Sequence, residues 1–144
     1  MIESDTIKLL RECDAGVKMG TASLDEVMPK VKSEELKKLL NACKDEHNVL
    51  DDEIRKRLDE FGDEGKDPNP IAKGMSWMKS EVMLGLKECD ETVADLMTDG
   101  CNMGVKSLSR YLNKYEAADE QSKDICKRLI HLEEKLAKDL RAFL

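Results

Sequence analysis

Apolar residues recur every three or four positions along most of this chain, which is the spacing expected of helices that bury one face. The first such stretch should run from about Asp5 to Pro29 and bury Leu10, Val17 and Leu24. Proline cannot donate a backbone hydrogen bond, so Pro29 marks the end of this helix or a kink in it. The pattern predicts a long amphipathic helix near the start of the chain.

A second helix should follow Ser33, whose hydroxyl suits an N-cap, with Glu34 and Glu35 in the first turn, where the helix dipole favours acids. The apolar face of this helix continues to Phe61, and Gly62 is a helix-ending residue. Because the link to the first helix is short, the two should be antiparallel neighbours.

Two further long helices are expected in the second half, from about Glu88 to Tyr115 and from about Ser122 to the C-terminus. The link between them, at 117–120, is short, so they should also be antiparallel. No run alternates apolar and polar residues as a strand would. The fold class predicted is therefore all-α.

The connection between the two pairs of helices is long. Polar, turn-forming residues occupy 62–70, and residues 71–84 are typical of a short apolar helix. A crossover at about 62–87 would make the second and third long helices parallel, within a single four-helix-bundle domain covering 1–144. The alternative is an up-down-up-down bundle whose third helix starts at Pro70 and runs unbroken to about Met97.

The net charge of −7 argues against binding to nucleic acid or to an anionic membrane, both of which attract basic surfaces. No apolar run approaches the ~18 residues of a membrane span. The five cysteines are scattered and the start of the chain lacks a signal-peptide pattern, which together predict reduced thiols and a cytoplasmic protein. Homodimers are common among such bundles, so a second copy is the first partner to consider.

Several short motifs resemble a known superfamily. They are Glu-Leu-Lys-Lys-Leu at 35–39, Asp-Glu-His at 45–47, Gly-Met-Ser-Trp-Met-Lys at 74–79, Gly100 and Tyr111. With these motifs the chain resembles the ferritin-like superfamily, and in particular small bacterial ferritin-like bundles of unknown function. The resemblance implies two hairpins joined by a crossover. In metal-binding relatives it also implies two irons held by inward Glu residues and by Glu-x-x-His motifs.

The motifs for two irons are not intact in this sequence. Lys44 stands three residues before His47, and Arg128 stands three before His131, where the relatives carry Glu. Cys101 follows Gly100 where relatives often have Gly-Glu. These departures argue against ferroxidase or oxygenase activity. They favour a structural or interaction module, with di-iron chemistry as the second alternative.

Helical wheels place Asp14, His47, Cys101 and Glu133 near the middle of the bundle, on or beside the inward faces. These side chains are of the types that bind zinc, iron or manganese, so a nonstandard metal site is the first alternative function. A second interpretation is structural, with His47 hydrogen-bonded to Asp14 and with Cys43 and Cys101 filling small volumes in the core.

Two further interpretations concern the histidines and glycines. A Cys101–His47 pair could supply a nucleophile if the thiol had a lowered pKa and an open pocket. His131 lies opposite the apolar face of its helix and should be solvated. The pairs Gly16/Gly20 and Gly100/Gly104 either allow neighbouring helices to approach closely or leave room for a ligand.

Overall fold

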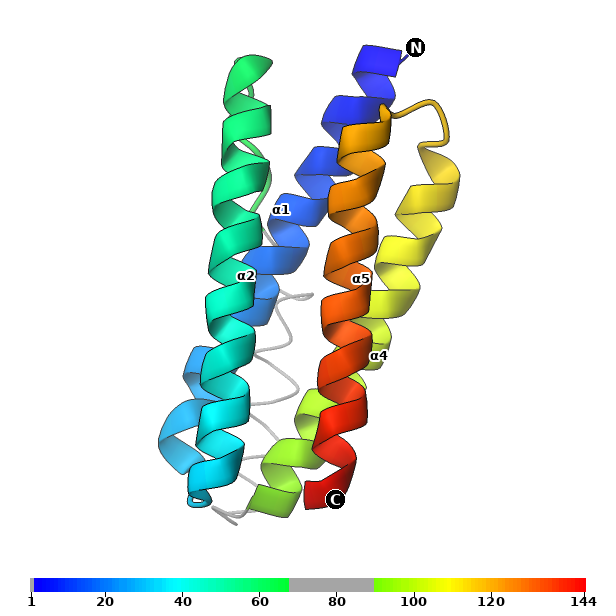
Figure 1. Ribbon diagram of the computed structural model, residues 1–144. Helices are drawn as coiled ribbons and strands as arrows, with labels where there is room; N and C mark the ends of the chain where they lie inside the picture. The colour runs from blue at the N-terminus through cyan, green and yellow to red at the C-terminus, as the bar shows by residue number, and fades with distance from the viewer. Residues whose placement is uncertain (1, 68–89) are drawn as a thin grey trace.

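The computed structural model describes residues 2–67 and 90–144, and these form four long helices. No strand occurs in these two ranges, so the all-α prediction is confirmed. Short 3₁₀ turns follow the first and last helices (Figure 1). The elements are α1 (Ile2–Val27), η1 (Met28–Lys30), α2 (Glu34–Glu60), α4 (Asp90–Lys114), α5 (Glu120–Leu140) and η2 (Arg141–Phe143).

The helix ends follow the local signals in the sequence. Ser33 caps α2, because its hydroxyl accepts a hydrogen bond from the backbone N–H of Leu36 at 3.3 Å. Past the end of α2, Gly62 adopts a φ of 65°, which only glycine tolerates well. The predicted start of α5 at Ser122 was two residues late, because Asp119 is the N-cap and accepts from the N–H of Ser122 at 2.8 Å.

The first turns of α2 and α4 lie at the same end of the bundle. The carboxylate of Asp90 accepts hydrogen bonds from the backbone N–H groups of Lys32 (2.8 Å) and Ser33 (3.0 Å). At the other end, Arg57 near the end of α2 pairs with Asp119 at the start of α5. Hence α2 and α4 run in the same direction (Figure 1), and the up-down-up-down alternative is wrong. The predicted short helix at 71–84 lies outside the described residues.

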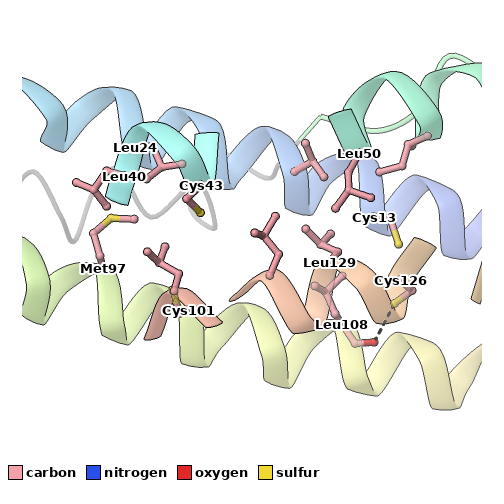
Figure 2. Packing of buried hydrophobic residues seen from close by; sticks show 14 of the residues in the cluster. Cys13, Leu24, Leu40, Cys43, Leu50, Met97, Cys101, Leu108, Cys126 and Leu129 are labelled. Carbon is pink, nitrogen blue, oxygen red and sulfur yellow. Dashed lines mark hydrogen bonds between the residues drawn. The ribbon is translucent and has the colours of Figure 1, made fainter. Parts of the chain in front are cut away.

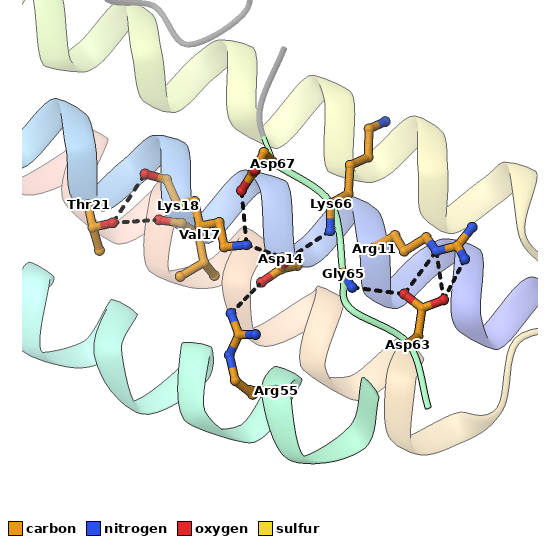
Figure 3. Close-up of polar contacts among 10 residues, drawn as sticks. All are labelled: Arg11, Asp14, Val17, Lys18, Thr21, Arg55, Asp63, Gly65, Lys66 and Asp67. Carbon is orange, nitrogen blue, oxygen red and sulfur yellow. Dashed lines mark hydrogen bonds and ion pairs between the residues drawn. The ribbon is translucent and has the colours of Figure 1, made fainter. Parts of the chain in front are cut away.

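The chain leaving α2 is held against α1 by polar contacts (Figure 3). The fully buried carboxylate of Asp14 accepts from the Nζ of Lys18 and from the backbone N–H of Lys66, both at 2.9 Å. Arg11 pairs with both carboxylate oxygens of Asp63. Gly65 has a φ of 86°, and a Cβ there would lie 2.3 Å from Asp14 Oδ2. Asp14 therefore fixes the path of the connection out of α2.

The inward faces of all four helices share one apolar core (Figure 2). Leucines supply much of it, and the cysteines at 13, 43, 101 and 126 are buried within it as free thiols. Cys126 donates to the backbone oxygen of Leu108 at 3.7 Å. The prediction that Cys43 and Cys101 fill core volume is confirmed. None of the helices in the two described ranges is both long and apolar enough to cross a membrane.

Candidate functional site

A buried hydrogen-bond chain links α2 to α5 near the middle of the bundle. His47 is 1% exposed and its Nε2 lies 2.9 Å from Oε1 of Glu133. On the other side of the ring, Nδ1 lies 2.8 Å from the backbone oxygen of Cys43. Both ring nitrogens therefore face acceptors. The form of the imidazole that satisfies both is the doubly protonated one, which donates twice and carries a positive charge.

The charged form of His47 is favoured despite its burial. Burial by itself lowers the pKa of His47, but the hydrogen bonds with Cys43 and Glu133 and the negative charge of Glu133 raise it to about 10. At neutral pH, His47 and Glu133 thus form an ion pair with no net charge. Only 12% of the Glu133 side chain is exposed, so this pair is nearly enclosed.

Space for the imidazole exists because residue 20 of α1 is a glycine. A Cβ at Gly20 would lie 2.6 Å from Nε2 and 2.8 Å from Cδ2 of His47, closer than such atoms approach. Gly104 on α4 differs, since a Cβ there would make ordinary contacts of 3.7 Å with Glu133. Gly20 is therefore required by the position of His47, whereas Gly104 is not required by any such contact.

A cavity of about 370 Å³ opens beside this pair, mainly between α1 and α4. All four glycines that the sequence paired line it, which agrees with their interpretation as room for a ligand. Its walls are largely apolar and include Met19, Leu24, Met97, Leu108 and Leu136. Charged groups lie at two places only among the described lining residues, His47 with Glu133 and Lys66 with Glu12.

Cys101 also lines the cavity but is not arranged as a nucleophile. Burial raises the pKa of its thiol well above the usual value, and the nearby charge of Glu133 raises it further. The thiol is therefore protonated at neutral pH, and it faces Glu133 rather than the ring nitrogens of His47. The nucleophile interpretation finds no support in this geometry.

The structure brings together three of the four residues predicted at mid-bundle. His47, Glu133 and Cys101 are neighbours, but Asp14 binds Lys18 and Lys66 and lies 3.8 Å from Arg55. The predicted hydrogen bond between His47 and Asp14 is wrong, because Glu133 is the partner of the imidazole. Within residues 2–67 and 90–144, no three His, Cys, Asp or Glu side chains are placed to hold a metal ion.

His131 behaves as its pattern predicted. Its side chain is 79% exposed on α5 and lies 3.4 Å from Glu134. The cavity could not be predicted from the sequence. A helical wheel shows which face of a helix turns inward, but it does not show whether neighbouring side chains fill the space between helices. The two pairs of glycines were the only signal of it.

Fold and site together define an all-α four-helix bundle with a buried ion pair beside an apolar cavity. Comparison with known proteins found no matching family model, no matching curated protein and no matching solved structure.

Gly20→Ala tests how tightly the imidazole is held. We expect this change to lower the free energy of unfolding by about 2 kcal/mol, because the new methyl group must displace a ring that two hydrogen bonds hold. Gly104→Ala is the matched control and should be neutral or stabilising by up to about 1 kcal/mol, because alanine favours helix. Urea unfolding of both variants measures the difference. Equal effects would mean that His47 does not occupy the position described.

The pH dependence of stability tests the charge on His47. Its pKa is higher in the folded chain, about 10, than the usual value of 6.5, so protonated His47 stabilises the fold. That contribution is complete below pH 6.5 and is lost as the pH rises towards 10. Between these limits, the difference in unfolding free energy between wild type and His47→Leu should shrink, by at most about 1.4 kcal/mol per pH unit. A difference independent of pH would contradict a charged imidazole.

Proposed function

We propose that this protein is a binding module that takes up one small, largely apolar molecule in the cavity between α1 and α4. The observation that carries the proposal is the cavity of about 370 Å³, with apolar walls and one buried ion pair at its side. Binding sites for small molecules are commonly concave and apolar with a few fixed polar groups, and the space between helices of a bundle is a frequent location.

The length of the cavity suits an extended molecule. It is lined along α1 from Glu12 to Leu24 and along α4 from Met97 to Tyr111. Twelve residues of α-helix span about 18 Å, so the lining is much longer than one side chain. The glycines at 16, 20, 100 and 104 carry no side chains that could fill it.

This proposal specifies the interaction module expected from the sequence as one that binds a small molecule. A ferritin-like origin remains part of it, supported by the parallel course of α2 and α4 and by the motifs in the sequence. A cytoplasmic location is supported by the free thiols of the described cysteines. A metal site receives no support from the described residues. Less than a tenth of an equivalent of zinc, iron or manganese in protein purified without chelator is the expected result.

A fluorescent probe tests the proposal directly. N-phenyl-1-naphthylamine is uncharged and emits strongly in apolar surroundings, and we expect wild-type protein to bind one molecule per chain with saturation. Ala15→Leu should weaken this binding at least tenfold, because Ala15 lines the cavity and a larger side chain takes up its volume. The control is Ala42→Leu, at an exposed position of α2 outside this cavity, which should bind the dye as wild type does.

Two results would overturn the proposal. One is the absence of saturable binding by wild-type protein that unfolds cooperatively. The other is equal binding by wild type and Ala15→Leu, which would place the dye elsewhere on the molecule.

A further inference from the structure

The chemical class of the ligand can be inferred from the polar groups at the side of the cavity, and this inference rests on the proposed function. His47, Cys101 and Glu133 meet there, each supplied by a different helix. The hydrogen-bond donors of His47 are already used, whereas an acceptor on Glu133 remains free, and this difference determines which head group of a ligand can bind.

The hydrogen-bond donors of His47 are already engaged. One N–H of His47 points to the backbone oxygen of Cys43 and the other to Glu133. The thiol of Cys101 lies close enough to Glu133 for the carboxylate to help raise the pKa of the thiol, which therefore stays protonated. A carboxylate offers about four lone-pair positions, so Glu133 retains acceptor capacity beside the cavity. Ser23 and Ser107 also line the cavity, but a hydroxyl both donates and accepts and so does not discriminate between head groups.

A negatively charged head group is disfavoured at this position. It would approach the carboxylate of Glu133, while the N–H groups of His47 that could receive it are occupied. The other charged pair, Lys66 with Glu12, is also neutral as a pair. Like charges in a poorly solvated site repel strongly, since the effective dielectric constant there is low.

A positively charged head group is disfavoured for a different reason. His47 already neutralises Glu133, so an ammonium group would leave one unpaired positive charge in a nearly enclosed site. It could bind only if His47 gave up its proton to solvent. An uncharged donor avoids both penalties, because it uses the free lone pairs of Glu133 and leaves the ion pair intact.

We propose that the ligand of this cavity is an uncharged molecule with an extended apolar body and a terminal hydroxyl group that donates to Glu133. The apolar body lies between α1 and α4, in the direction of Glu12 and Tyr111. From the level of Gly20 to that of Glu12, eight residues of helix span about 12 Å, which suits a chain of medium length.

Three molecules with the same tail and different head groups test this inference. Decanol, decanoate and decylamine are each used to displace N-phenyl-1-naphthylamine from wild-type protein at pH 7. We expect decanol to displace the dye at a concentration at least tenfold lower than either charged molecule. The comparison needs no variant, so it does not depend on whether a mutant folds.

The variant Glu133→Gln tests whether Glu133 determines which head group the cavity prefers. The amide keeps the shape of the side chain and an oxygen for His47, but it removes the negative charge and adds an N–H donor. We expect decanoate to bind at least tenfold more tightly to this variant than to wild type, because the repelling charge of Glu133 is gone and the bound carboxylate can take its place as the anion beside protonated His47. Glu134→Gln, at an exposed neighbouring position, is the matched control and should leave the order of the three molecules unchanged.

The outcomes separate the two proposals. If the dye binds but a charged molecule displaces it as well as decanol does, or none of the three displaces it, the hydroxyl ligand is wrong and the binding cavity stands. Unchanged selectivity in Glu133→Gln also overturns the role given to Glu133. If neither the dye nor decanol binds, the proposed function fails and this inference fails with it.

Discussion

Replacing either His47 or Glu133 by leucine should lower the free energy of unfolding by about 3 kcal/mol, because each change leaves the other charge buried without its partner. The exposed fractions of the two side chains are 1% and 12%, so water replaces the lost partner poorly. The double variant should cost clearly less than the sum of the two single changes, since two apolar side chains then meet in place of one stranded charge.

A double-mutant cycle measured by urea unfolding at pH 7 gives the coupling, which we expect to be at least about 2 kcal/mol. The cycle between Asp14 and His47 is the internal control. Asp14 binds Lys18 and Lys66, and His47 binds Cys43 and Glu133, so the two have no partner in common. Their effects should be additive within about 0.5 kcal/mol. Additivity between His47 and Glu133 would contradict the ion pair.

Gly65→Ala should be the most damaging change outside the core, with a cost of about 3 kcal/mol. Its φ of 86° lies in the left-handed region, where a side chain costs about 1 kcal/mol or more. In addition, its Cβ would lie 2.3 Å from Asp14 Oδ2, so the carboxylate must move and lose its hydrogen bond from the N–H of Lys66.

Gly62→Ala separates these two causes. Gly62 also has a positive φ, 65°, but no atom lies within 4 Å of the position a Cβ would occupy. It should therefore cost only the backbone strain, about 1 kcal/mol. When Asp14 is first replaced by alanine, the additional cost of Gly65→Ala should fall to that of Gly62→Ala. Thermal unfolding of the five proteins tests this, and equal costs for the two glycine variants in the wild-type background would contradict the contact with Asp14.

The His47–Glu133 pair gives the cavity both a stable wall and a chemical preference. The pair carries no net charge, and both N–H groups of His47 are already hydrogen-bonded within the protein. The carboxylate of Glu133 can still accept a hydrogen bond from a ligand. Stability and selectivity at this site therefore depend on the same proton. Raising the pH towards 10, where His47 loses that proton, should weaken the fold and change the preferred head group together.

Much of the fold could be predicted from the sequence because its causes are local. The spacing of apolar residues sets which face of each helix is buried, Ser33 caps α2, and Gly62 ends it by taking up a positive φ. The exposure of His131 follows from the same spacing. These features depend on residues within a few positions of one another.

The side-chain contacts between different helices could be identified only from the tertiary structure. A wheel places His47 and Asp14 on inward faces, but the height and rotation of each helix decide which side chain the imidazole meets, and it meets Glu133. Asp14 instead holds the chain beyond Gly65, a contact between residues about fifty positions apart. The cavity likewise arises only when four helices pack and glycines leave space unfilled. The sequence by itself therefore determined the helices and their buried faces, whereas packing decided the ion pair and the cavity, because both are formed by residues distant in the chain.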